Sequence, residues 1–174
     1  RYLTRLAPAR IGVLTSISSA HIGQFGSLER IADEKLVLLT SLSGKAPHAV
    51  VNGDDEQIVS RLARVTAPVT RYGCERGNAV AADAVSERLV FKPGVEESFG
   101  VSATVHCHEE TAALSLVDCV AGHMISASLA AIAVGWIYKI PLGRMCADLK
   151  RFRLFKGRMR LIPGINDTLT YWAL

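Results

Sequence analysis

The sequence predicts an α/β fold, a three-layer domain with a mostly parallel sheet and a small antiparallel β addition. Short apolar segments alternate with helical segments up to residue 72, the order expected of parallel strands joined by crossover helices. Beyond residue 79, apolar and polar residues alternate between turn signals, which is typical of antiparallel strands. With 174 residues, 49% of them hydrophobic and 21% charged, the chain can bury one good core.

The first half of the chain supplies the parallel part. Residues 1–10 have the pattern of a helix end or a loop. Ser27 is a suitable N-cap for the first long helix, because its hydroxyl can accept a hydrogen bond from a free N–H of the first turn. We expect strands at 11–17, 48–51 and 69–72, and helices at 28–42 and 56–64.

The second half supplies antiparallel strands and two further helices. A meander is expected over 79–116, with turns at 92–94 and 98–100. Residues 121–140 are apolar enough for a membrane span, but their small side chains and the polar turns around them favour a buried core helix. We expect strands at 88–91, 101–107 and 160–162, helices at 122–138 and 142–152, and a hairpin turn at 166–167 before a last strand.

Composition limits the partners and the compartment. The net charge of +4 permits ligands that carry phosphate, but 6% aromatic residues are few for base stacking, so we expect no nucleic-acid partner. The basic residues between 150 and 160 are most simply a solvated surface. The four cysteines form no CxxC pair and no signal peptide is visible, which favours free thiols in the cytoplasm.

Lys35 stands on the apolar side of the helix predicted at 28–42. At about 100° per residue it lies about 20° from Leu28, in the same stripe as Ile31 and Leu39. A lysine at such a position either extends its charged end to the solvent or has a chemical role, and spacing alone favours the first.

Polar residues follow the first two predicted strands. His21 comes after the first, and Asn52, Gly53, Asp54 and Asp55 follow the second. The carboxyl ends of parallel strands meet at one edge of the sheet, where ligands bind. An asparagine amide can pair with the edge of adenine through one donor and one acceptor. Taken alone, one histidine does not make a metal site, and the second group equally suits a polar turn.

Several segments resemble, in the same order, motifs of the Mur ligases: residues 11–35, NGDD at 52–55, GH at 122–123 and GRM at 157–159. Mur ligases are ATP-dependent enzymes that form amide bonds in peptidoglycan synthesis. The resemblance is strongest to members that add D-alanyl-D-alanine. It implies a central ligase domain, in which ATP phosphorylates a carboxylate of a UDP-muramyl peptide and an amine then attacks the acyl phosphate.

The resemblance also implies roles for individual residues. His21 and Lys35 would hold Mg²⁺, and Lys35 would be the catalytic residue, as a carbamate that bridges to the metal. A carbamate is an anionic oxygen ligand suited to a hard cation, and a lysine in apolar surroundings would favour the neutral amine that captures carbon dioxide. The residues implied to bind ATP are Asn52 and Asp55 at the nucleoside, Arg158 at a phosphate, and also His123.

The chain departs from the family pattern in several places. Met124 and Ala127 stand where the family usually has asparagines, and the phosphate-binding motif GxxxxGK[ST] is absent. We expect residues 1–156 to be a central ATP-binding domain without its N-terminal phosphate-loop part, and residues 157–174 to be a linker and the start of a C-terminal ligase domain. Such a piece of a longer protein should not turn over alone.

The expected partners are a UDP-muramyl peptide and an amino acid or dipeptide, and the expected state is a monomer. Three other interpretations stay open. The parent could be a related folylpolyglutamate- or cyanophycin-type ligase. It could be a degenerate, non-catalytic nucleotide-binding module, or a basic nucleic-acid-binding protein.

His106 and His108 form a separate metal-like pattern. On a strand both side chains would share one face and could bind zinc or nickel. Spacing places no third ligand beside them, so we do not predict a metal site there.

Overall fold

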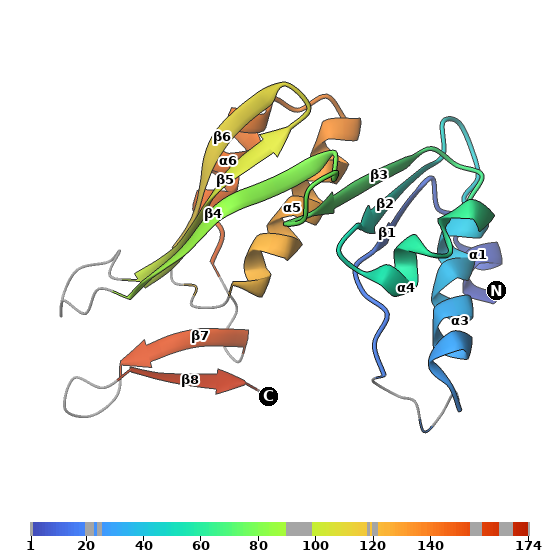
Figure 1. Ribbon diagram of the computed structural model, residues 1–174, viewed down its shortest axis with the longest axis horizontal. Coiled ribbons are helices and arrows are strands. Elements are labelled where there is room, and N and C mark those ends of the chain that lie inside the picture. Colours follow the sequence, from blue (N-terminus) through green and yellow to red (C-terminus); the bar gives the residue numbers. More distant parts are fainter. Residues whose placement is uncertain are drawn as a thin grey trace. The chain divides into compact units, whose positions relative to one another are not determined.

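The computed structural model describes residues 2–19, 23, 26–89, 99–117, 119, 122–153, 158–163 and 169–173. The chain divides into two compact units, Arg1–Ala81 and Ala82–Leu174. Figure 1 shows the elements of each unit along the chain.

The first unit is a parallel βαβ arrangement, as predicted. β1 pairs with β2 and β2 with β3, all parallel, with Ile11 opposite His48 and Ala49 opposite Val69. Helix α3 packs against β1, and α4 packs against β2 (Figure 1). The elements are α1 (Tyr2–Leu6), β1 (Ile11–Leu14), α3 (Leu28–Thr40), β2 (His48–Asn52), α4 (Glu56–Val59), a 3-10 turn (Leu62–Arg64) and β3 (Val69–Gly73).

The core of this unit forms between α3 and the strands. One face of α3 is buried, and apolar residues of β1, β2 and α4 pack against it. Ser27 caps α3 as predicted, since its hydroxyl accepts a hydrogen bond from the N–H of Arg30 at 3.3 Å. The buried residues of this core are Leu14, Ile17, Ile31, Ala32, Leu36, Leu39, Ala49, Val51 and Ile58.

Two elements are shorter than predicted. The strand expected at 11–17 ends at Leu14, because side chains rather than a neighbouring strand bind the backbone of Thr15, Ser16 and Ile17. The helix expected at 56–64 becomes α4 and a separate 3-10 turn, where the N–H of Arg61 bonds three residues back to Ile58.

The second unit is antiparallel, as predicted for this part of the chain. β5 pairs with β6 from Gly100 opposite Val117 to Cys107 opposite Glu110. β4 begins parallel to β3, and the strand order is β1-β2-β3-β4-β5-β6. The turn expected at 98–100 is wrong at its end, since Phe99 and Gly100 open β5. The strands are β4 (Val80–Leu89), β5 (Phe99–Cys107) and β6 (Glu110–Val117).

Two helices and a hairpin complete this unit. α5 (His123–Ile137) buries Ile125, Leu129 and Ile132 and leaves the opposite side exposed, so it is a core helix, as predicted. Within the described part of the chain, no helix has the length and apolar character to cross a membrane. The remaining elements are α6 (Leu142–Lys150) and the antiparallel pair β7 (Arg158–Pro163) and β8 (Leu169–Ala173). The predicted turn at 166–167 lies outside the described residues.

Candidate functional site at the strand ends

Three of the predicted site residues meet on the short segment that follows β1. The amide Nδ2 of Asn52 donates to the carbonyl of Thr15 at 3.1 Å, and Nζ of Lys35 donates to the carbonyl of Ser16 at 2.7 Å. The N–H of Ile17 donates to Oδ2 of Asp55 at 2.8 Å. Residues from α3 and from the end of β2 therefore hold three successive residues at the carboxyl end of β1.

Asp55 joins two segments through one carboxylate. Its Oδ1 accepts from the N–H groups of Gln57 at 2.9 Å and Ile58 at 3.3 Å, which caps α4. Its Oδ2 accepts from Ile17. A carboxylate offers about four lone-pair positions, so about one stays available for a ligand.

The side-chain amide of Asn52 uses some of its hydrogen-bonding positions within the fold and leaves others for a ligand. Its Nδ2 donates to Thr15, and its Oδ1 accepts from the N–H of Asp54 at 3.0 Å. Because a primary amide has two N–H donors and two acceptor positions, one donor and one acceptor remain. That is the pair of contacts expected for the edge of adenine.

Lys35 is exposed, so the expectation that it lies in apolar surroundings is wrong. Its backbone position is on the side of α3 that carries the buried Ile31 and Leu39, as its spacing indicated. The long side chain nevertheless carries the ammonium out of the core to the carbonyl of Ser16. Any reactivity of Lys35 must therefore come from its place at the strand ends.

The two aspartates give this edge an acidic character. Burial, and then the negative charges of Asp54 and Asp55, raise the pKa of Tyr72 to about 12. Partial burial, and then the charge of Asp54, raise the pKa of the Cys74 thiol. Negative potential at the strand ends favours a cation or a ligand that brings one.

Asp54 is the residue that sequence reasoning missed. Its carboxylate accepts hydrogen bonds from two backbone N–H groups and a side-chain amide in the segment after β3. The available signal was its position inside the NGDD motif, but both aspartates of such a motif suit a polar turn equally well.

The other predicted site residues lie elsewhere or are not described. His21 lies outside the described residues. His123 is the first residue of α5 and is exposed, and the backbone of Arg158 opens β7. Both belong to the second unit, so their roles in binding ATP stay predictions.

His106 and His108 do not share one face of a strand, which corrects that expectation. β5 ends at Cys107, and His108 has a φ of 52° in the turn that follows. His106 lies 3.1 Å from Asp83 and 3.1 Å from Thr111, whereas the ring of His108 stacks on Trp136. Among the residues that the structure describes, no three His, Cys, Asp or Glu side chains form a group that could hold a metal ion.

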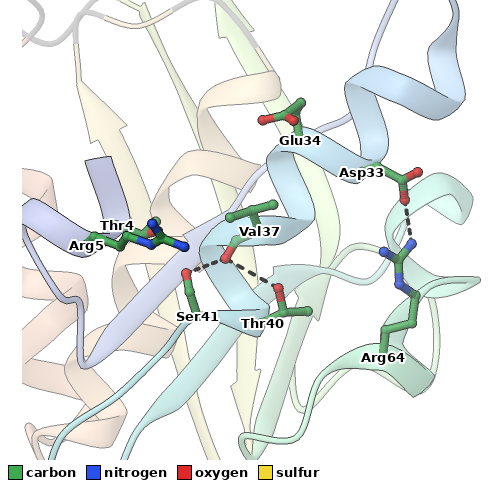
Figure 2. A pocket seen from close by; sticks show the side chains of 8 residues that line it. All are labelled: Thr4, Arg5, Asp33, Glu34, Val37, Thr40, Ser41 and Arg64. Atoms are coloured by element: carbon green, nitrogen blue, oxygen red, sulfur yellow. Dashed lines mark hydrogen bonds and ion pairs between the residues drawn. The ribbon is translucent and has the colours of Figure 1, made fainter. Parts of the chain in front are cut away.

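Figure 2 shows a pocket of about 430 Å³ beside α3. An ion pair between Arg64 and Asp33 crosses one side of it, and the hydroxyls of Thr40 and Ser41 both donate to the carbonyl of Val37. No predicted site residue lines this pocket, so the converging contacts at the strand ends remain the better candidate. The lining residues are Thr4, Arg5, Asp33, Glu34, Val37, Thr40, Ser41 and Arg64.

Comparison with known sequences identifies a matching family. The profile of the Mur ligase middle domain matches residues 1–135. UDP-N-acetylmuramoyl-tripeptide--D-alanyl-D-alanine ligases of Mycobacterium bovis and Mycobacterium tuberculosis are 33% identical over 135 residues, 76% of this chain. The match covers 24% of each relative, so the chain spans about a quarter of their length.

Comparison with solved structures finds the same fold. MurF from Acinetobacter baumannii has a TM-score of 0.81 at 16% identity, covering 95% of this chain and 34% of that protein. MurF ligase from Thermotoga maritima, solved in complex with ADP, has a TM-score of 0.75 at 19% identity, covering 92% of this chain and 34% of that protein.

Proposed function

The chain belongs to the Mur ligase middle-domain family, and from this we propose that it is the ATP-handling part of a peptidoglycan-precursor ligase. The reaction we propose for the whole protein joins D-alanyl-D-alanine, or another amino acid, to a UDP-muramyl peptide. ATP would phosphorylate a carboxylate of this peptide, and the amine would attack the acyl phosphate and displace phosphate. The compartment would be the cytoplasm. The mycobacterial relatives, whose name states this substrate pair, support the proposal.

One observation carries the proposal furthest: Asn52, Lys35 and Asp55 converge on Thr15, Ser16 and Ile17. In parallel α/β sheets, ligands bind outside the carboxyl ends of the strands. Asn52 keeps one donor and one acceptor for a base, and Asp55 keeps about one acceptor position for a ribose hydroxyl. The nucleoside of ATP would therefore lie along this edge, on groups that the fold already holds in place.

Lys35 would provide a Mg²⁺ ligand at this edge of the sheet. A carbamate formed on Nζ keeps one N–H, so the contact with Ser16 can persist while two anionic oxygens become available. Mg²⁺ is commonly held by one or two carboxylate-like ligands together with phosphates and water, so one carbamate suits it without a larger cluster. His21 would be a further ligand, and the bound Mg²⁺ would neutralise charge on the transferring phosphoryl group.

The domain division follows from the same proposal. Residues 1–156 would be the middle domain without its phosphate-loop part, and residues 157–174 would lead into a C-terminal domain. His123 and Arg158 would contribute to ATP binding, and the working state would be a monomer.

A titration of the ¹⁵N-labelled chain with Mg·ADP tests the proposal. We expect saturable shifts of the amide signals of Thr15, Ile17 and Asn52, which Asn52→Ala weakens. The control variant Asp148→Asn alters an exposed residue of α6 and should leave the titration unchanged. Absence of saturable shifts at the strand ends up to millimolar Mg·ADP would overturn the proposal.

A non-catalytic nucleotide-binding module is the second candidate, because Met124 and Ala127 replace two amides of the family pattern. The coding sequence upstream of Arg1 separates the two. A GxxxxGK[ST] motif followed by an acidic residue there supports the ligase, and a sequence without them supports the binding module. Carbamate density on Lys35 in a crystal grown with bicarbonate also favours the ligase.

A further inference from the structure

We infer that Asp54 is a positioning residue. Its carboxylate fixes the turn after β3 at the same edge of the sheet as the ends of β1 and β2, where we propose that the nucleotide binds. The inference rests on the proposed function, since it assigns a role within that site. It concerns the turn formed by residues 74–78, which follows β3 as residues 15–17 follow β1.

The carboxylate of Asp54 ties this turn to the end of β2. Oδ2 accepts from the N–H of Cys74 at 2.6 Å, and Oδ1 accepts from the N–H of Glu75 at 3.0 Å. Oδ1 also accepts from Nδ2 of Asn78 at 2.8 Å, and the same amide donates to the carbonyl of Glu75 at 2.9 Å. Hydrogen bonds to an ionised acceptor are stronger than neutral ones, so this carboxylate is a firm anchor.

Two glycines make room for the anchor. A Cβ at Gly73 would lie 2.1 Å from Oδ1 of Asp54, so the carboxylate occupies the space that a side chain would fill. A Cβ at Gly53 would lie 1.8 Å from Oδ1 of Asn78. The glycine of NGDD therefore lets Asn78 approach Asp54.

Further contacts close the turn from its other side. Nη2 of Arg71 donates to the carbonyl of Gly77 at 3.1 Å, and the N–H of Ala79 donates to the carbonyl of Arg71 at 3.0 Å. Gly77 has a φ of 93°, a conformation that glycine adopts readily. The turn is thus held at its start by Asp54 and at its end by Arg71.

Asp54 also contacts the side-chain amide of Asn52, which we propose binds adenine. Its backbone N–H donates to Oδ1 of Asn52, so the residue that anchors the turn also orients Asn52. The two adjacent aspartates bind different segments: Asp55 holds the segment after β1, and Asp54 holds the turn after β3. Loss of the Asp54 carboxylate should therefore loosen the turn and disturb Asn52 while β1 keeps its own anchor.

The experiment uses Asp54→Asn in the full 174-residue chain. Asparagine keeps the shape but turns one acceptor into a donor that faces N–H groups. Cys74 is a built-in reporter, because it is exposed while Cys107, Cys119 and Cys146 are buried. We expect Mg·ADP to bind about tenfold more weakly to the variant, the effect of losing about 1.4 kcal/mol. We also expect iodoacetamide to label Cys74 faster in this variant and in Asn78→Ala, which keeps the Asp54 charge that raises the Cys74 pKa and so isolates the loosening of the turn.

Two controls separate positioning from general stability. Asp33→Asn removes a surface ion pair, and Ser27→Ala removes a helix cap. Both should leave the Cys74 labelling rate and the Mg·ADP affinity within twofold of the original chain, whatever they do to the melting temperature. A folded Asp54→Asn chain with unchanged labelling and unchanged affinity would overturn the inference.

Two further outcomes, a chain that binds no Mg·ADP and a variant that does not fold, also test the inference. If the original chain binds no Mg·ADP, the proposed function fails, and the labelling rate of Asn78→Ala, in which the charge of Asp54 is unchanged, decides whether Asp54 fixes the turn. If Asp54→Asn does not fold, Asn78→Ala replaces it, because this change removes one of the three contacts on the carboxylate. Asn78→Ala should then raise the labelling rate by a smaller factor, and no change would overturn the inference.

Discussion

Gly73 shows at the residue scale how little space the strand ends leave. In Gly73→Ala the new Cβ would lie 2.1 Å from Oδ1 of Asp54, so the carboxylate must move and release the N–H groups of Cys74 and Glu75. We expect the free energy of unfolding to fall by about 1–3 kcal/mol, the cost of unpaired polar groups. Urea unfolding followed by circular dichroism measures it.

Gly143→Ala is the matched control for this substitution. No atom lies within 4 Å of a Cβ at Gly143, which is in helix α6. Its stability should stay the same or rise, because alanine is the better helix former. Equal loss in both variants would show that Asp54 does not depend on the space at Gly73.

His48 gives the chain a defined pH response. Burial lowers the pKa of this imidazole from its ordinary value of 6.5, so the unfolded chain binds the proton more readily than the folded chain. Its contribution to stability is therefore complete above about pH 6.5 and is lost as the pH falls below it. Lowered pKa values at Glu29 and Asp33 act in the same direction, but in a lower range, since their ordinary values are 4.5 and 3.8.

Melting temperatures of the original chain and His48→Gln between pH 7.5 and 5.0 test this response. Glutamine can keep a hydrogen bond to Thr70, which lies 2.9 Å from Nε2 of His48, without taking up a proton. The variant should lose less stability than the original chain over this range. Parallel curves would contradict the assignment to His48.

At the element scale, α3 and α4 begin with different kinds of cap. Ser27 serves α3 alone, since its side chain accepts from the N–H of Arg30 at 3.3 Å and hydrogen-bonds Glu29, whereas Asp55 caps α4 and also holds Ile17. Ser27→Ala should cost about 1 kcal/mol of stability. Asp55→Ala should cost about 2–4 kcal/mol, because it leaves additional backbone N–H groups without a partner. Urea unfolding of the two variants compares them, and equal losses would show that the bond to Ile17 adds nothing.

The same elements show what the sequence could predict. The start of α3 and the buried positions on it follow from local spacing and from Ser27, so they were predictable. The end of β1 was not, because Lys35, Asn52 and Asp55 bind its following residues from 19 to 38 positions away. The exposure of Lys35 was likewise hidden, since periodicity places the backbone of a residue and a long side chain can leave that position. The role of Asp54 was not predictable either, because it depends on the turn after β3, which lies beside Asp54 only in the folded chain.

At the scale of the whole molecule, the proposed nucleoside site lies in a chain that lacks the phosphate-binding motif of the family. Its match covers 24% of each mycobacterial relative, and its 174 residues contain no GxxxxGK[ST]. Positioning and charge stabilisation at the phosphates supply nearly all of phosphoryl-transfer catalysis. Binding of a nucleotide and turnover of ATP should therefore separate in this chain.

The 174-residue chain should release no ADP above background with ATP, Mg²⁺, a UDP-muramyl tripeptide and D-alanyl-D-alanine. Nucleoside contacts alone can hold the base, but without the backbone cradle of the phosphate loop the γ-phosphate is not fixed for attack. A coupled ADP assay measures the release, with the Thermotoga maritima ligase as the positive control. Steady release that Lys35→Ala abolishes would contradict the prediction and would mean that residues of this chain supply the missing cradle. Release that persists in Lys35→Ala would contradict it as well, unless a mock preparation without the chain releases ADP at the same rate and so identifies a contaminating ATPase.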